Sequence, residues 1–346
     1  MLGSALCPLA PAKIMIRLRP EVLMRFVLLL GTWLLLGCAM EPTHDYTVTF
    51  PSLTVMPGVE RTECVVLKLG NTEPVHIGQI HNLLSPASHH MIIYRVDDTV
   101  EQPVPTDCLP FVEIFDAKKG APLMITQKKD ELLNLPSGVV YTLEPNQMVR
   151  LEMHYLNATT SPLVVSGSST MTTSPTFHDE ADFLFIGNPD IKIAPQAKFT
   201  LGPTFFPLDT DTFGDVNFFA FTGHEHHFGT GVTIQTAADS ADAAGAAVYA
   251  VPDWNWSEPA TVMHDPPIRL PAGGGFKFTC DWSNTSDKKV EFGESANDEM
   301  CFFWAYYYPS KGSYVCIHTQ IDHGHDFCRP GAVECAFVLP ILTGTP

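Results

Sequence analysis

The chain has 346 residues, of which 45% are hydrophobic and 17% charged, so it has enough apolar material for folded cores and is unlike a disordered protein. Its length suggests about two domains. The formal net charge of −18 argues against nucleic-acid binding and against attraction to an anionic membrane surface, because both need basic side chains. An acidic protein can, however, attract metal cations.

The first 38 residues are expected to be a signal peptide. Three arginines precede an uncharged run from Phe26 to Leu36, which is too short to span a bilayer. The run ends in Leu-Gly-Cys38, which is similar to a bacterial lipobox, where the Cys is lipidated. The alternative is an ordinary signal peptide with an incidental Cys38. We therefore expect an exported lipoprotein, periplasmic or on the outer surface, whose only membrane contact is the lipid anchor.

From about Tyr46 onward, short alternating runs are broken by Pro, Gly, Asn and Asp, and helical periodicity is scarce. This pattern predicts an all-β fold of two tandem antiparallel β-sandwich domains. The Ala-rich stretch Ala237–Ala250 is ambiguous, and we expect a loop or a short helix there. The clearest predicted strands are residues 46–50, 91–96, 148–155 and 276–280.

A polar stretch that ends at Pro175 predicts the domain boundary, which gives expected domains at 46–174 and 175–340. Nine cysteines are present, and seven of them follow the expected signal peptide. Export to an oxidising compartment makes disulfides the default interpretation, with one cysteine left over.

The strongest local metal signal is His224-Glu-His226. On a strand, residues i and i+2 point to the same face, so two imidazoles lie side by side and form a half-site for copper or zinc. The alternative is a solvated histidine-rich turn that also includes His227.

Four other residues are weaker candidates. His89 and His90 would face opposite sides of a regular strand, so sharing one metal requires a bulge or a strand end. Otherwise one of them is a surface histidine and the other a core histidine. His154 is a third imidazole or a packed histidine. Met300 is either core or a soft thioether ligand that suits copper.

Four motifs in chain order resemble the copper type II ascorbate-dependent monooxygenase family, which has a dopamine-type and a peptide-amidating branch. They are His89-His90-Met91, Leu151-Glu-Met-His154-Tyr155, His224-Glu-His226-His227-Phe-Gly229 and Asp298-Glu-Met300-Cys301, the last followed by Tyr-Tyr-Pro309. The resemblance extends over residues 46–320.

This resemblance implies jelly-roll-like domains with the active-site cleft between them and two copper ions per chain. In the first domain, the electron-transfer copper would be held by His89, His90 and His154. In the second domain, the catalytic copper would be held by His224, His226 and Met300. O2 would be the co-substrate, and ascorbate or another one-electron donor the reductant. The second electron would cross a solvent-filled cleft from the first copper.

The sequence departs from the peptide-amidating branch at the substrate. Its Arg two residues before His-x-His is replaced by Thr222, and the Asn and Tyr that follow the Met are replaced by Phe302 and Trp304. The resemblance therefore favours an apolar or aromatic small-molecule substrate over a peptide. The alternative is that these aromatic residues are simply core.

The resemblance also implies the disulfides Cys64–Cys108 and Cys280–Cys301. Cys316 would pair with Cys328 or Cys335. The nearby residues His318, His323 and His325 could bind metal, but a disulfide-tied C-terminal loop is the simpler expectation.

Together these features predict an exported, copper-dependent, reductant-requiring hydroxylase of an unknown small molecule. The alternative is a non-catalytic copper-binding or copper-storage lipoprotein on the same scaffold. A third hypothesis is an adhesion or structural sandwich with vestigial sites, which would bind no copper tightly.

Overall fold

The computed structural model describes residues 43–108, 111, 121–243, 245–320 and 325–330. The expected signal peptide and Cys38 lie outside these residues, as do His323 and Cys335. Residues Thr43–Pro346 belong to one compact unit. None of the helices in the described ranges is long and apolar enough to cross a membrane.

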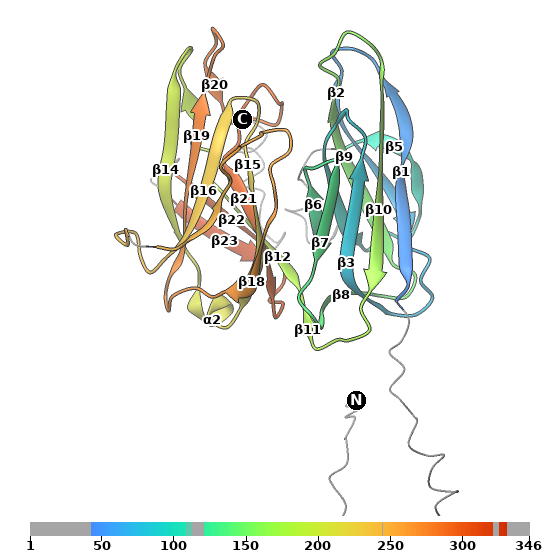
Figure 1. Cartoon of the computed structure of the whole chain (residues 1–346). Helices are drawn as coiled ribbons and strands as arrows, with labels where there is room; N and C mark the ends of the chain where they lie inside the picture. The colour runs from blue at the N-terminus through green and yellow to red at the C-terminus, as the bar shows by residue number, and fades with distance from the viewer. Residues whose placement is uncertain (1–42, 109–110, 112–120, 244, 321–324, 331–346) are drawn as a thin grey trace, which may run out of the picture. The chain divides into compact units, whose positions relative to one another are not determined.

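Residues 45–180 form the N-terminal sandwich, whose two sheets lie face to face (Figure 1). One sheet has the order β1-β10-β3-β8-β11, with β7 also paired to β3, and the other has the order β5-β2-β9-β4-β6. Only the β8–β11 pair is parallel among these strands. The strands of the first sheet are β1 (Asp45–Val55), β3 (Val75–Leu84), β7 (Asp130–Asn134), β8 (Val139–Leu143), β10 (Leu163–Thr173) and β11 (Asp179–Glu180). Those of the second are β2 (Glu60–Lys68), β4 (Ser88–Val96), β5 (Gln102–Asp107), β6 (Ala121–Thr126) and β9 (Met148–Leu156).

Residues 182–330 form the C-terminal sandwich. Its first sheet has the order β18-β15-β21-β12-β22-β23 and its second β14-β19-β16-β17. A short pair, β13 (Lys192–Ile193) with β20 (Val290–Glu291), and the one-turn helix α2 (Thr210–Phe213) complete it. The first sheet contains β12 (Asp182–Gly187), β15 (Asn217–His224), β18 (Val262–Ile268), β21 (Phe302–Tyr308), β22 (Tyr314–Thr319) and β23 (His325–Pro330). The second contains β14 (Lys198–Pro207), β16 (Gly229–Ala237), β17 (Ala247–Ala250) and β19 (Gly275–Ser283).

The all-β expectation is confirmed, and the four predicted strands lie within β1, β4, β9 and β19. Sheet membership changes between Glu180 and Asp182, a few residues beyond the expected boundary at 174–175. The expectation of a loop or helix over Ala237–Ala250 was only half right. A turn follows Ala237, but β17 then pairs with β16 and buries Tyr249, so burial of apolar side chains selects a strand there.

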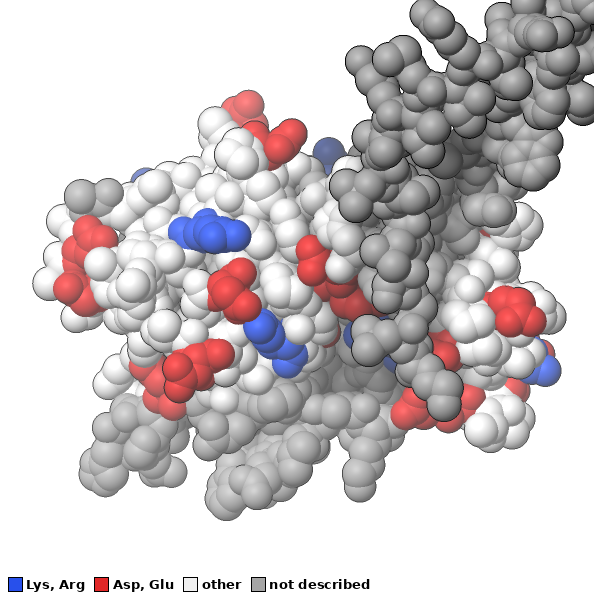
Figure 2. Space-filling model, turned by 90° about the horizontal axis from the view of Figure 1, so that it is seen from below, with Lys and Arg blue, Asp and Glu red and all other residues white. Residues whose placement is uncertain are grey.

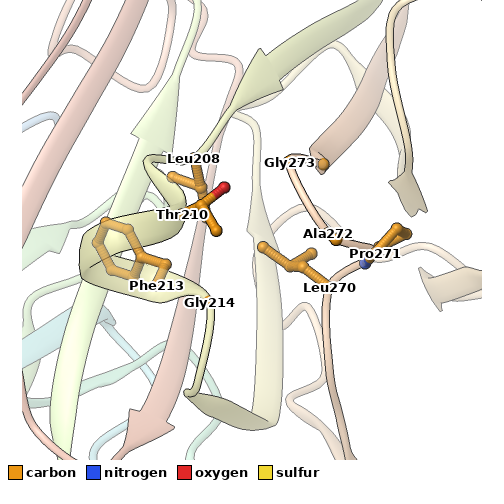
Figure 3. Close-up of a pocket in the computed structure, with 9 residues that line it drawn as sticks. Leu208, Thr210, Phe213, Gly214, Leu270, Pro271, Ala272 and Gly273 are labelled. Carbon is orange, nitrogen blue, oxygen red and sulfur yellow. The ribbon is translucent and has the colours of Figure 1, made fainter.

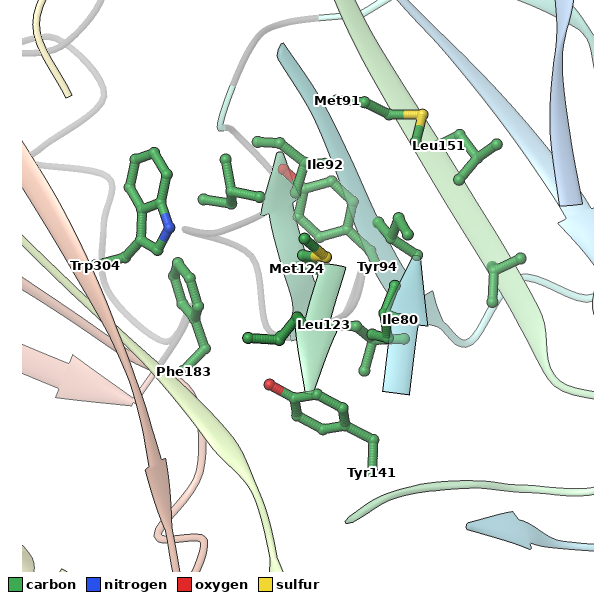
Figure 4. Close-up of a cluster of buried hydrophobic side chains, with 14 of the residues drawn as sticks. Ile80, Met91, Ile92, Tyr94, Leu123, Met124, Tyr141, Leu151, Phe183 and Trp304 are labelled. Atoms are coloured by element: carbon green, nitrogen blue, oxygen red, sulfur yellow. The ribbon is translucent and has the colours of Figure 1, made fainter. Parts of the chain in front are cut away.

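Strand β21 is buried on both faces. Its alternate residues Phe303, Ala305 and Tyr307 pack between the two sheets of the C-terminal sandwich. Residues Phe302, Trp304 and Tyr306 belong instead to a cluster shared with the N-terminal sandwich. Because side chains alternate along a strand, one face of β21 packs in the core of the C-terminal sandwich and the other face packs in the shared cluster. Figure 4 shows part of the shared cluster, in which Trp304 and Phe183 face Ile92, Tyr94, Leu123 and Met124.

Among the described residues, three disulfides join Cys64 to Cys108, Cys280 to Cys301 and Cys316 to Cys328. The first two are the pairs that the family resemblance implies, and the third ties β22 to β23. On the face drawn in Figure 2, acidic side chains are scattered among fewer basic ones, in keeping with the net charge of −18. The described residues visible on that face form no continuous basic surface for a phosphate backbone.

Candidate metal centre

His89 and His90 reach the same side of the protein through a register shift. The pairing of β4 with β9 slips by one residue between Ser88 and His90, so His89 is the extra residue of a bulge. A bulge re-aims a side chain that a regular strand would point to the opposite face. The ring centroids of His89 and His90 lie 5.3 Å apart as a result.

His154 lies opposite His90 in the β4–β9 register. Its Nε2 donates to Oε1 of Glu60 at 3.1 Å, and Glu60 also accepts from the backbone N–H of Ala296 at 2.8 Å. Burial alone would raise the pKa of Glu60, but the hydrogen bonds from His154 and Ala296 outweigh it and lower the pKa to about 2. The carboxylate therefore stays ionised and fixes the orientation of the His154 ring.

His224 is the last residue of β15, and His226 follows it just before the turn into β16. Their ring centroids are 5.0 Å apart. The backbone N–H of His226 donates to Oε2 of Glu299 at 2.8 Å, which holds the turn in place. Nδ1 of His224 is hydrogen-bonded to Oε1 of Gln127, a residue of the N-terminal sandwich.

These five imidazoles come together in one buried cluster. His89 lies 5.2 Å from His154, 5.9 Å from His224 and 5.8 Å from His226, measured between ring centroids. One ligand atom from each of His89, His224 and His226 can be chosen so that all three lie within 4.8 Å of one another. The structure therefore brings together histidines that the family resemblance assigns to two separate copper sites.

The unpaired nitrogen atoms of the cluster suit a bound metal ion. Four of its buried imidazole nitrogens have no hydrogen-bond partner among the described residues, namely His89 Nε2, His90 Nδ1, His224 Nε2 and His226 Nδ1. Buried polar atoms are almost always satisfied, so four unpaired nitrogens in one cluster are the arrangement that a bound metal would satisfy. Burial also lowers the pKa of His226 to about 4 and the pKa values of His89, His90 and His224 well below their usual range. Neutral imidazoles are the form that binds metals.

Met300 is linked to this cluster through its neighbours in the chain. Phe302, the register partner of His224, is the first residue of β21, and Met300 lies two residues before it. Met300 is buried, and its predecessor Glu299 bonds the His226 backbone. Burial outweighs the hydrogen bonds to Glu299 and raises its pKa to about 7.

The three predicted substrate residues are also buried. Phe302 stacks on Phe185 with centroids 4.9 Å apart, and Trp304 lies 6.0 Å from the His224 ring. Thr222 is hydrogen-bonded to Thr261 through their hydroxyl groups at 2.8 Å. Phe302 and Trp304 thus belong to the shared core, and both border the histidine cluster.

The exposure of the site differs from an open, solvent-filled cleft. The six predicted ligands expose at most 6% of their surface, because the apolar face of β21 and its neighbours packs on the N-terminal sandwich. The half-buried Trp256 packs on His89 at 5.4 Å and stacks on His227 at 5.4 Å, so it covers one side of the cluster. The hollow beside α2 in Figure 3 lies among Leu208, Phe213 and Leu270 and contains no histidine.

Four site residues were missed by sequence reasoning, namely Glu60, Gln127, Trp256 and Glu299. Glu299 directly precedes the predicted ligand Met300, and this position was the one sequence signal that could have marked it as a site residue. Glu60 and Gln127 meet their histidines at separations of 94 and 97 residues, and no local pattern marks them.

Comparison with known proteins finds one matching family model. Residues 180–325 match the C-terminal domain of the copper type II ascorbate-dependent monooxygenases, and this stretch includes His224, His226 and Met300.

Two solved structures show only faint similarity. The major capsid protein P2 of bacteriophage PM2 aligns over 77% of this chain and 97% of its own, with 9% identity and a TM-score of 0.33. PNGase F, a glycosylasparaginase from Flavobacterium meningosepticum, aligns over 77% and 97%, with 10% identity and a TM-score of 0.29. Similarities this low carry no argument for function.

Proposed function

We propose that this protein is a copper-dependent monooxygenase that hydroxylates a C–H bond of an apolar or aromatic small molecule, with O2 and a one-electron reductant such as ascorbate. The observation that carries the proposal is the buried cluster of five imidazoles with four unpaired nitrogens. This cluster occurs in a chain whose residues 180–325 match the C-terminal domain model of a copper monooxygenase family.

The proposed ligands divide into two sets. His89, His90 and His154 would hold one copper, and His224, His226 and Met300 the other. Copper held in this way supplies one-electron redox chemistry and activates O2. The thioether of Met300 is a soft donor that favours the reduced ion. Glu60 and Glu299 orient the imidazole of His154 and the backbone at His226, which are contacts that typically tune a metal site.

The proposed substrate class follows from the residues around His224. Trp304 and Phe302 offer aromatic surface, and Thr222 supplies no positive charge for a carboxylate. Their burial means that a substrate reaches them only after the packing between the two sandwiches loosens. We therefore propose a small uncharged substrate that enters by such a movement.

The proposed location is outside the cytoplasm. Three disulfides are typical of a protein folded in an oxidising compartment. A lipid anchor on Cys38, in the periplasm or on the outer surface, remains part of the proposal.

Copper stoichiometry on residues 39–346 tests the proposal, with spectra recorded before and after ascorbate. We expect about two coppers per chain, both reducible, followed by substrate-dependent O2 consumption in a screen of aromatic small molecules. One copper or none would contradict the proposed pair of sites.

The low exposure of the cluster favours one rival, a non-catalytic copper-binding or copper-storage protein. Such a protein would bind copper just as tightly. It would show no product and no O2 consumption that depends on a substrate, so the same screen separates the two functions.

A further inference from the structure

We propose that Gln127, from the N-terminal sandwich, is a positioning residue that fixes the Nδ1–H tautomer of His224 and thereby presents the Nε2 lone pair to a metal. The inference deepens the proposed function. Only its consequence for copper binding rests on that function. The tautomer itself is a property of the protein without metal.

The orientation of the Gln127 side-chain amide follows from its two contacts. Nε2 of Gln127 lies 3.0 Å from the carbonyl oxygen of Gly223, and Oε1 faces Nδ1 of His224. The opposite orientation would set two oxygens, Oε1 and the Gly223 carbonyl, against each other. Gln127 therefore donates to Gly223 and accepts from His224.

A carboxamide oxygen can only accept a hydrogen bond, so Nδ1 of His224 must carry the proton. The neutral ring then has its lone pair on Nε2, and this atom is buried with no partner among the described residues. Which nitrogen of a histidine binds metal is set by the hydrogen bond of the other nitrogen. Gln127 supplies that bond here.

Gln127 is itself held by a chain of hydrogen bonds that connects it to β15, the strand that carries His224. Its backbone N–H donates to Oε2 of Glu131 at 3.1 Å, and Oε1 of Glu131 accepts from the hydroxyl of Thr261. Thr261 in turn bonds Thr222, two residues before His224 on β15. Gln127 and Glu131 thus hold the end of β15 through direct hydrogen bonds to Gly223 and His224 and through Thr261 to Thr222.

This arrangement couples the two sandwiches. Gln127 lies outside the matched domain of residues 180–325, whereas His224 lies within it. The C-terminal metal half-site therefore takes its ligand geometry from the N-terminal sandwich, and separation of the sandwiches would release the ring of His224.

The first test is ¹⁵N NMR of the metal-free protein with labelled histidine, with the His224 signals assigned by their loss in His224→Asn. We expect a protonated Nδ1 and an unprotonated Nε2 for His224 at neutral pH. The opposite tautomer in the wild-type protein would overturn the inference, and this result needs no variant of Gln127 to fold.

The second test compares Gln127→Leu with Gln147→Leu. Gln147 is a matched control because its amide also donates to backbone carbonyls, those of Val96 and Met148, each at 2.9 Å. We expect Gln127→Leu alone to mix the His224 tautomers and to weaken Cu(I) at one of the two sites by about 10- to 100-fold in a competition titration. Equal copper affinity in both variants would overturn the positioning role.

Failure of the proposed function gives a different result. If Gln127→Leu alters the tautomer but neither it nor the wild-type protein binds copper, the tautomer assignment stands and the copper function is wrong. If copper binds normally and the His224 tautomer is the same in both proteins, the function stands and the role of Gln127 is wrong.

Discussion

Nε2 of His90 and Nδ1 of His154 lie 3.3 Å apart across neighbouring strands. In the neutral form of His154, which is the form that binds a metal, donation from Nε2 to Glu60 leaves the lone pair on Nδ1, and His90 then donates to it. Copper binding through Nδ1 of His154 would have to break this bond. Glu60 therefore determines which nitrogen of His154 is available to a metal.

We predict that Glu60→Leu weakens copper binding at the three-histidine set by about 10- to 100-fold, because the acceptor that orients His154 is lost. The measurement is a Cu(I) competition titration that resolves the two sites. Glu63→Leu is the control, since Glu63 lies on the same strand and accepts from the Tyr155 hydroxyl at 2.6 Å without contacting an imidazole. A similar loss in the control would show that the effect is general destabilisation.

Met300→Ile is expected to remove copper from the C-terminal set, or its reactivity with O2, while the N-terminal set keeps its metal. The two side chains have similar volumes, so the loss of unfolding free energy should stay below about 1.5 kcal/mol. Metal analysis and denaturant unfolding measure the two effects. Met171→Ile, at a buried methionine on β10, should retain both coppers. If Met300→Ile binds and reacts like the wild-type protein, the thioether is not a ligand.

Local rules predicted the strands, because their alternation depends on residues two positions apart. The same rule singled out His224-Glu-His226, although β15 ends at His224 and His226 follows the strand. They also indicated that His89 and His90 could share one metal only at a distorted strand, and the register of β4 does shift at His89. They could not predict Glu60 or Gln127, which reach their histidines only after the sheets have packed. The convergence of all five imidazoles was also unpredictable, since it depends on which face of β21 packs on the N-terminal sandwich.

The disulfide between Cys280 and Cys301 is expected to support the metal site as well as the fold, because Cys301 directly follows Met300. Its loss in the double variant Cys280→Ala/Cys301→Ala should lower the free energy of unfolding by about 3 kcal/mol. It should also weaken copper at the C-terminal set. The variant Cys64→Ala/Cys108→Ala should lose comparable stability without that copper effect. Denaturant unfolding and copper titration together distinguish the two roles.

Glu294 should make the protein less stable as the pH rises. Burial raises its pKa from 4.5 to about 7, so the folded state binds the proton more tightly than the unfolded state does. The stabilisation is therefore complete below about pH 4.5 and is lost as the pH rises through about 7. Glu294→Gln should remove this part of the pH dependence. Urea midpoints at pH 4.5, 6 and 7.5 measure it, and parallel curves for the two proteins would contradict the prediction.

Trp256 is expected to shield the histidine cluster from solvent. Its ring packs on His89 and stacks on His227, while His89 itself exposes only 6% of its surface. In the metal-free protein, Trp256→Ala should therefore speed acylation of His89 by diethyl pyrocarbonate, followed by peptide mass spectrometry. Trp254→Ala, in the same loop, is the control and should leave the rate unchanged. Copper should protect His89 in both variants if this ring is a ligand. Labelling of Trp256→Ala as slow as that of the wild-type protein would mean that the sandwich packing alone closes the site.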